Sequence, residues 1–170
     1  MNGFKIAIAT KDKEREDLIL MGTDADPKYD PDVHDKSTQT SIIDSVDIFF
    51  NTIDNNAKNK SSGMQAKIEI KGKIPGSPEL MRTFQKLSEW ARDDTYDTQN
   101  RNICIGIKAN NDRFQVVYSI KNVFVVNYRE IYSKANDDRF ELYLTQEEGN
   151  MDKIEIFKDW PSEWDWARKG

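Results

Sequence analysis

The chain has 170 residues, a formal net charge of −5 and an isoelectric point near 5.0, with 37% hydrophobic and 32% charged residues. A chain of this length folds as one domain without needing a disulfide or a metal ion. The acidic balance argues against nucleic-acid recognition. No signal peptide and no apolar run long enough to span a membrane is visible, so we expect cytoplasmic synthesis and no membrane partner.

The first third of the chain predicts strands, because apolar and polar residues alternate in short runs. Residues 4–8 predict a first strand and residues 18–21 a short second one. Residues 22–40 are polar and contain two prolines, which predicts a long acidic loop. Residues 42–53 form the next β-rich stretch, and residues 66–71 predict a half-buried strand.

One convincing helix follows, over residues 78–92. Ser77 is a good N-cap, Pro78 suits the first helical position, and Glu79 suits the positive end of the helix dipole. An apolar stripe at helical spacing predicts the face that packs on the sheet: Leu80, Phe84, Leu87 and Ala91, flanked by Met81 and Trp90.

The remaining sequence returns to strands. Alternating runs cover residues 103–107, 114–120, 123–128, 140–144 and 154–156, and Lys121-Asn122 breaks the longest apolar stretch. We count about eight strands around one helix. Connections of hairpin length favour antiparallel pairing, so the predicted fold is a mainly β sandwich or barrel with the helix packed outside.

The acidic loop is the sharpest candidate for a ligand site. Five aspartates lie within twelve residues: Asp24, Asp26, Asp30, Asp32 and Asp35. Calcium favours several carboxylate oxygens, but the spacing lacks the glycine and the glutamate of an EF-hand loop. We therefore favour a solvated acidic loop and keep a cation site as the alternative.

Catalytic signatures are weak. His34 is the only histidine, and its neighbours Asp35 and Ser37 do not form an oriented triad merely by adjacency. Cys104 is the only cysteine, and its apolar run predicts a small buried side chain. The adjacent pair Glu147 and Glu148 suits a turn better than a glycosidase site. We expect no enzyme activity and no cofactor.

Three tryptophans crowd the C-terminal tail, residues 158–170. Trp160, Trp164 and Trp166 would form an apolar patch if exposed, and such patches mark contact surfaces. The sequence leaves two alternatives open. Either the tail folds back on its own core, or it contacts another subunit.

The order of elements from residue 64 to residue 157 resembles a known family. A strand at 66–74 precedes a single helix, a strand at 103–109 follows, and the segment 118–146 then carries a loose motif. The motif residues are Ile120, Asn122, Val123, Val125 and Val126, followed by Phe140, Leu142 and Leu144. This pattern is similar to the tail-tube family of contractile phage tails, tailocins and the haemolysin-coregulated tube protein of type VI secretion.

The resemblance implies a structural subunit that assembles into hexameric rings, with further copies of itself and sheath, baseplate or tube-end proteins as partners. The long 22–40 loop and the tryptophan-rich tail depart from the family pattern, so a tube initiator, a baseplate component or a tube-end adaptor remains an alternative to a tube subunit. The rival from another class is a monomeric β-sandwich module that binds a sugar or Ca²⁺ through the acidic loop. Oligomeric state separates the two.

Overall fold

The computed structural model describes residues 3–10, 19–22, 42–52, 57–59, 63–76, 78–109, 114–135 and 137–161. Within these ranges, no helix is long and apolar enough to cross a membrane. Almost all of the predicted acidic loop lies outside the described residues, as do Trp164 and Trp166.

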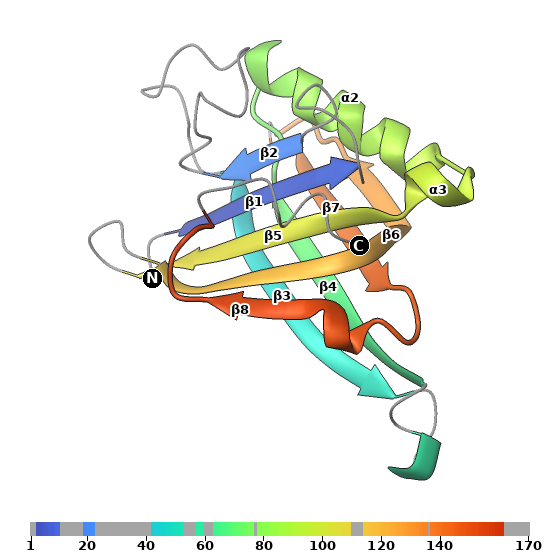
Figure 1. The fold of residues 1–170 in the computed structure, drawn as a ribbon. Helices are drawn as coiled ribbons and strands as arrows, with labels where there is room; N and C mark the ends of the chain where they lie inside the picture. The colour runs from blue at the N-terminus through green and yellow to red at the C-terminus, as the bar shows by residue number, and fades with distance from the viewer. Residues whose placement is uncertain are drawn as a thin grey trace.

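In the described part of the chain, eight strands form one antiparallel sheet (Figure 1), which confirms the predicted strand number and antiparallel pairing. Seven of them lie in the order β2-β1-β5-β6-β7-β4-β3, and β8 pairs with β6 beside this path. The strands are β1 (Gly3–Thr10), β2 (Ile19–Gly22), β3 (Ile43–Thr52), β4 (Met64–Lys73), β5 (Arg101–Lys108), β6 (Phe114–Ile131), β7 (Arg139–Gln146) and β8 (Ile154–Phe157).

The longest strand, β6, joins the two halves of the sheet. Its first half pairs with β5 on one side and with β8 on the other, while its second half, from Val123, pairs with β7. β7 and β8 therefore lie end to end along the same side of β6. Lys121-Asn122 was predicted to break the run, but both residues remain inside the 18-residue strand and mark a bend in it.

The helices are α2 (Pro78–Arg92) and the one-turn α3 (Tyr96–Gln99), with short 3-10 turns η3 (Ala57–Asn59) and η5 (Met151–Lys153). α2 has the predicted bounds and crosses one end of the sheet, where it contacts β2 and β6 (Figure 1). Phe84, Leu87 and Trp90 are buried on the described part of the helix, whereas Ala91 is half-buried, and the side chain of Leu80 lies outside the described part.

The apolar core lies between α2 and the inward faces of the strands. The Phe84 ring meets the Phe140 ring edge to face, with centroids 5.3 Å apart. Trp90 is anchored as well as buried, because its indole Nε1 donates to the carbonyl of Gln99 across 2.8 Å. Burying an aromatic ring of this size contributes about 2–3 kcal/mol. This packing fixes α2 and α3 relative to the sheet.

Candidate assembly surface

The outer face of β3, β4, β7 and the second half of β6 is polar, although the inner face of β4 and β7 belongs to the core. Along β4, Ala66, Ile68 and Ile70 are fully buried. Their neighbours in sequence point to the opposite face, because side chains alternate along a strand. The strand registers place the following residues together on this face: Asp47, Lys67, Glu69, Lys71, Arg129, Arg139, Glu141 and Tyr143.

The charges on the polar face form a linked network across three strands. Arg129 Nε lies 3.7 Å from Oε2 of Glu141, and the Tyr143 hydroxyl donates to the same carboxylate oxygen across 2.9 Å. The Lys71 ammonium lies 5.8 Å from the centroid of the Tyr143 ring. The hydrogen bond to Glu141 raises the pKa of Tyr143 above its ordinary value. Exposed pairs of this kind add little stability, but they give the face a fixed pattern of alternating charge.

The polar face ends in an open strand edge on each side. β3 is the last strand of the order, and β4 is its one partner among the strands that the structure describes. On the other side, residues 124–131 of β6 pair only with β7 among the described residues. Exposed apolar side chains accompany both edges: Phe49 is 36% exposed on β3, and Val126 is 56% exposed on β6. Open edges with apolar residues can pair with further strands.

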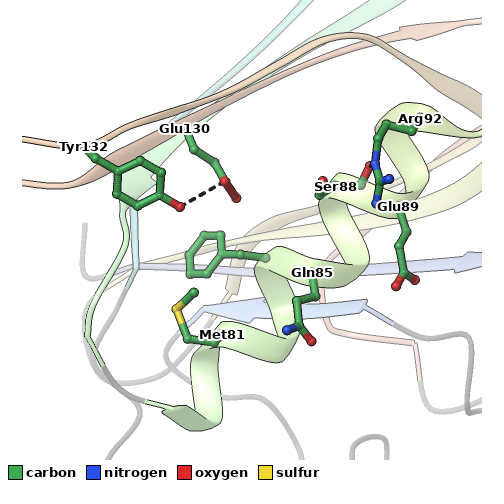
Figure 2. Close-up of a pocket in the computed structure, with 8 residues that line it drawn as sticks. Met81, Gln85, Ser88, Glu89, Arg92, Glu130 and Tyr132 are labelled. Atoms are coloured by element: carbon green, nitrogen blue, oxygen red, sulfur yellow. Dashed lines mark hydrogen bonds between the residues drawn. The ribbon is translucent and has the colours of Figure 1, made fainter.

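A cleft of about 480 Å³ lies between α2 and the end of β6 (Figure 2). Glu130 accepts hydrogen bonds from the hydroxyls of Tyr128 and Tyr132, across 2.8 and 3.0 Å. Burial, followed by the bond to Glu130, raises the pKa of Tyr128 above its ordinary value. From α2, Arg92 Nε donates to the carbonyl of Ser88 across 3.2 Å. Because both hydroxyls donate to the same carboxylate, this arrangement fixes the orientation of the three side chains.

A cluster of buried amides holds the bend in β6. Asn122 has φ +61°, the left-handed region, and its backbone N–H donates to Oδ1 of Asn102 across 3.2 Å. Its side-chain amide donates to Oδ1 of Asn150 across 2.8 Å. Gln146 Nε2 donates to the carbonyls of Lys121 and Asn150, across 3.0 and 2.9 Å. The sequence motif around Asn122 therefore marks the point where β6 changes partners.

Of the three tail tryptophans, the structure describes Trp160. Its ring centroid lies 5.9 Å from that of Phe114, and the Lys5 ammonium lies 4.3 Å from its centroid. A Cβ added at Gly106 would lie 2.5 Å from Cε1 of Phe114 and 3.2 Å from Cε3 of Trp160, so a glycine is needed beneath these rings. Trp160 thus packs on the outer face of β1, β5 and β6. Contact of the three tryptophans with another subunit stays a prediction.

The other candidate residues fall as follows. Asp24, Asp26, Asp30, Asp32, Asp35 and His34 lie outside the described residues. Cys104 is buried, as predicted, and burial raises the pKa of its thiol. Glu147 and Glu148 lie at the turn after β7, also as predicted. Within the described ranges, no group of three or more metal-ligating side chains gathers.

Sequence reasoning missed a second cleft, of about 450 Å³, beside this turn. Its lining residues are Gln65, Tyr96, Gln99, Asn100, Phe124, Glu147 and Glu148. They come from four separate segments, and only the glutamate pair stood out in the sequence. The Tyr96 hydroxyl donates to Oε1 of Glu147, and this bond raises the pKa of Tyr96.

Comparison with solved structures identifies the fold. The chain superposes on a variant of Hcp1 from E. coli EAEC 042 with a TM-score of 0.54 and 10% identity, covering 94% of this chain and 100% of Hcp1. A chain of the anti-feeding prophage baseplate gives a TM-score of 0.48 at 9% identity, covering 92% of this chain and 93% of its own length. A chain of the PVC sheath-tube complex gives 0.42 at 12% identity, covering 91% and 88%.

The likeness is one of fold alone, because the identity with these three structures is 9–12%. No protein-family model matches the sequence, and no curated protein is significantly similar to it. The match to Hcp1 nevertheless spans nearly the whole of both chains. The chain therefore has the Hcp-like tail-tube fold that the order of its elements resembles.

Proposed function

We propose that this chain, with its Hcp-like tail-tube fold, is a structural subunit of a contractile injection particle. It forms, initiates or adapts the inner tube by assembling into rings, and six subunits per ring is the number that the resemblance implies. The observation that carries the proposal is the polar face of the sheet bounded by two open strand edges. If the open edges of neighbouring subunits pair, the sheet and its polar face extend from one subunit to the next.

The two open edges differ, so the contact between subunits joins unlike surfaces. The β3 edge of one copy would pair with residues 124–131 of β6 in the next copy, which extends the sheet across the boundary. A contact between unlike surfaces repeats around an axis and closes into a ring when the rotation allows it. Phe49 and Val126, exposed beside the two edges, would become buried there.

The polar face then lines the lumen of the ring. Its inner side is already core, so the outer side must face water or a passing cargo. Alternating charges, as in the Arg129–Glu141 pair, suit a wet surface and give it no strong single-sign field. The same proposal assigns contacts with adjoining subunits, or with sheath and baseplate proteins, to two further segments. These are the acidic loop and the tail with Trp160, Trp164 and Trp166.

Phe49→Lys tests the edge contact. A lysine on an edge strand blocks pairing with a further strand, so we expect this variant to shift the protein from rings to monomers in analytical ultracentrifugation. Ile156→Lys is the matched control, because Ile156 is 65% exposed but lies on β8, which pairs with the first half of β6 and with neither of the two edges. Negative-stain microscopy of the unaltered chain should show closed rings. A strict monomer at every concentration and salt tested would contradict a self-assembling subunit.

A further inference from the structure

The cleft beside the β7–η5 turn is acidic at its rim, and one of its carboxylates, Glu147, accepts a hydrogen bond from the Tyr96 hydroxyl. Glu147 and Glu148 supply carboxylates at its rim. Asn100 also lines it and is only 3% exposed, and its Oδ1 has no hydrogen-bond partner among the described residues. Leaving a buried amide oxygen unpaired is costly, so the residues lining the cleft favour a ligand that donates.

The orientation of the Asn100 amide is fixed by its other hydrogen bond. Nδ2 of Asn100 donates to the carbonyl of Tyr96 across 3.2 Å. A carbonyl can only accept, so turning the amide over would place two acceptors against each other. The unpaired atom is therefore the oxygen, and the cleft has a buried acceptor as well as two carboxylates.

The aromatic side chains in the cleft favour a guanidinium group over a hard metal ion. Phe124 and the 60% exposed Tyr96 line it together with the acceptors. A planar guanidinium stacks on aromatic rings and donates along its edge to carboxylate and amide oxygens. A hard metal ion gains nothing from the rings and requires a shell of oxygens.

We propose that this cleft binds the guanidinium group of an arginine side chain supplied by another protein chain. The guanidinium donates to the carboxylates of Glu147 and Glu148 and to Oδ1 of Asn100, while its plane lies against Tyr96 or Phe124. The site is rigid, because the Gln99 carbonyl beside it accepts from the buried indole of Trp90. It requires no ring, so it stands independently of the proposed assembly.

The test is a TROSY NMR titration of the full chain with N-acetyl-arginine amide, with N-acetyl-citrulline amide as the uncharged control of the same shape. We expect saturable shifts at Tyr96, Gln99 and Asn100 with millimolar affinity for the arginine derivative, and at least fivefold weaker binding of the citrulline derivative. Equal binding of the two compounds would overturn the proposal without any variant having to fold.

Matched variants locate the site. Glu147→Gln and Glu148→Gln should each weaken arginine binding at least threefold, while Glu155→Gln, which removes an exposed carboxylate from β8, should leave it unchanged. Tyr96→Phe keeps the ring and releases Glu147 from the hydroxyl, so binding should become stronger. Unchanged arginine binding in both Glu147→Gln and Glu148→Gln would place the site elsewhere and refute the proposal. Preference for Ca²⁺ over the arginine derivative, measured at the same three signals, would refute it too.

Discussion

The side-chain amide of Asn122 donates to Oδ1 of Asn150 across 2.8 Å, and this bond ties the bend in β6 to the turn between β7 and β8. Both residues are buried. Because β7 and β8 lie along the same side of β6, the bend is the point where one half of the sheet gives way to the other. The left-handed backbone of Asn122 makes this change of direction possible.

Substitutions at Asn122 should reveal the cost of its backbone conformation. Val strongly disfavours positive φ, whereas Gly tolerates it. We expect Asn122→Val to be less stable than Asn122→Gly by about 1 kcal/mol or more, measured by urea unfolding. At the exposed Asn127 of the same strand, where φ is not positive, the order should reverse, because Val favours strands and Gly does not. The same ranking at both positions would mean that the strain at Asn122 is negligible.

Phe84 should be a major contributor to stability. Its side chain is 1% exposed and packs edge to face on Phe140. Truncation leaves a cavity, so Phe84→Ala should lower the free energy of unfolding by about 3–5 kcal/mol. Met81→Ala on the same helix should cost less than about 1 kcal/mol, because Met81 is partly exposed. Similar losses for both variants in urea unfolding would show that α2 is not docked by Phe84.

Ring assembly should respond to salt. Each subunit carries a formal net charge of −5, so neighbours in a ring repel one another while apolar and main-chain contacts attract. Screening is substantial at about 0.15 M salt, where the Debye length is about 8 Å. We expect the association constant from sedimentation to rise from about 0.02 to about 0.3 M NaCl. Weakening over this range would indicate that opposite charges, and not strand edges, hold the ring together.

The Cys104 thiol should make stability fall at mildly alkaline pH. Burial raises its pKa in the folded chain, whereas the unfolded thiol ionises near its ordinary value of about 8.5. A group whose folded pKa is raised contributes stability that is fully present below the unfolded pKa and is lost as the pH rises above it. Between about pH 8 and 9.5, the unaltered chain should therefore lose stability relative to Cys104→Ala. Parallel pH profiles in urea unfolding would contradict this linkage.

The order and type of the larger elements were predictable from local patterns, because alternation and helix capping depend on neighbouring residues. The bounds of α2 agree with the prediction, whereas its predicted N-cap, Ser77, lies outside the described residues. Its buried face was predicted less well: Trp90 is buried because α3 supplies a carbonyl to its indole, and that partner lies nine residues ahead. The bend at Asn122 was mistaken for a break because the residues that stabilise it, Asn102 and Asn150, are distant in sequence.

The clefts and strand edges could not be predicted from the sequence. Which strands lie at the edges depends on the sheet order, and that order places β4 beside β7 and β1 beside β5. The cleft with Asn100 brings together segments that no periodicity links. Local sequence patterns do not indicate which distant segments contact one another, so the residues that share a cleft can be identified only from the structure.

The pairing of β1 with β5 has a consequence for how the chain is made. Gly3 pairs with Lys108, so β1 gains this neighbour only after more than a hundred further residues have been synthesised. Until then the apolar residues Phe4, Ile6 and Ile8 lack the strand that shares their buried layer. Pairing between strands that are distant in sequence slows folding and prolongs the exposure of apolar, aggregation-prone surface. Until β5 emerges, β2 is the one partner available to β1 among the described strands.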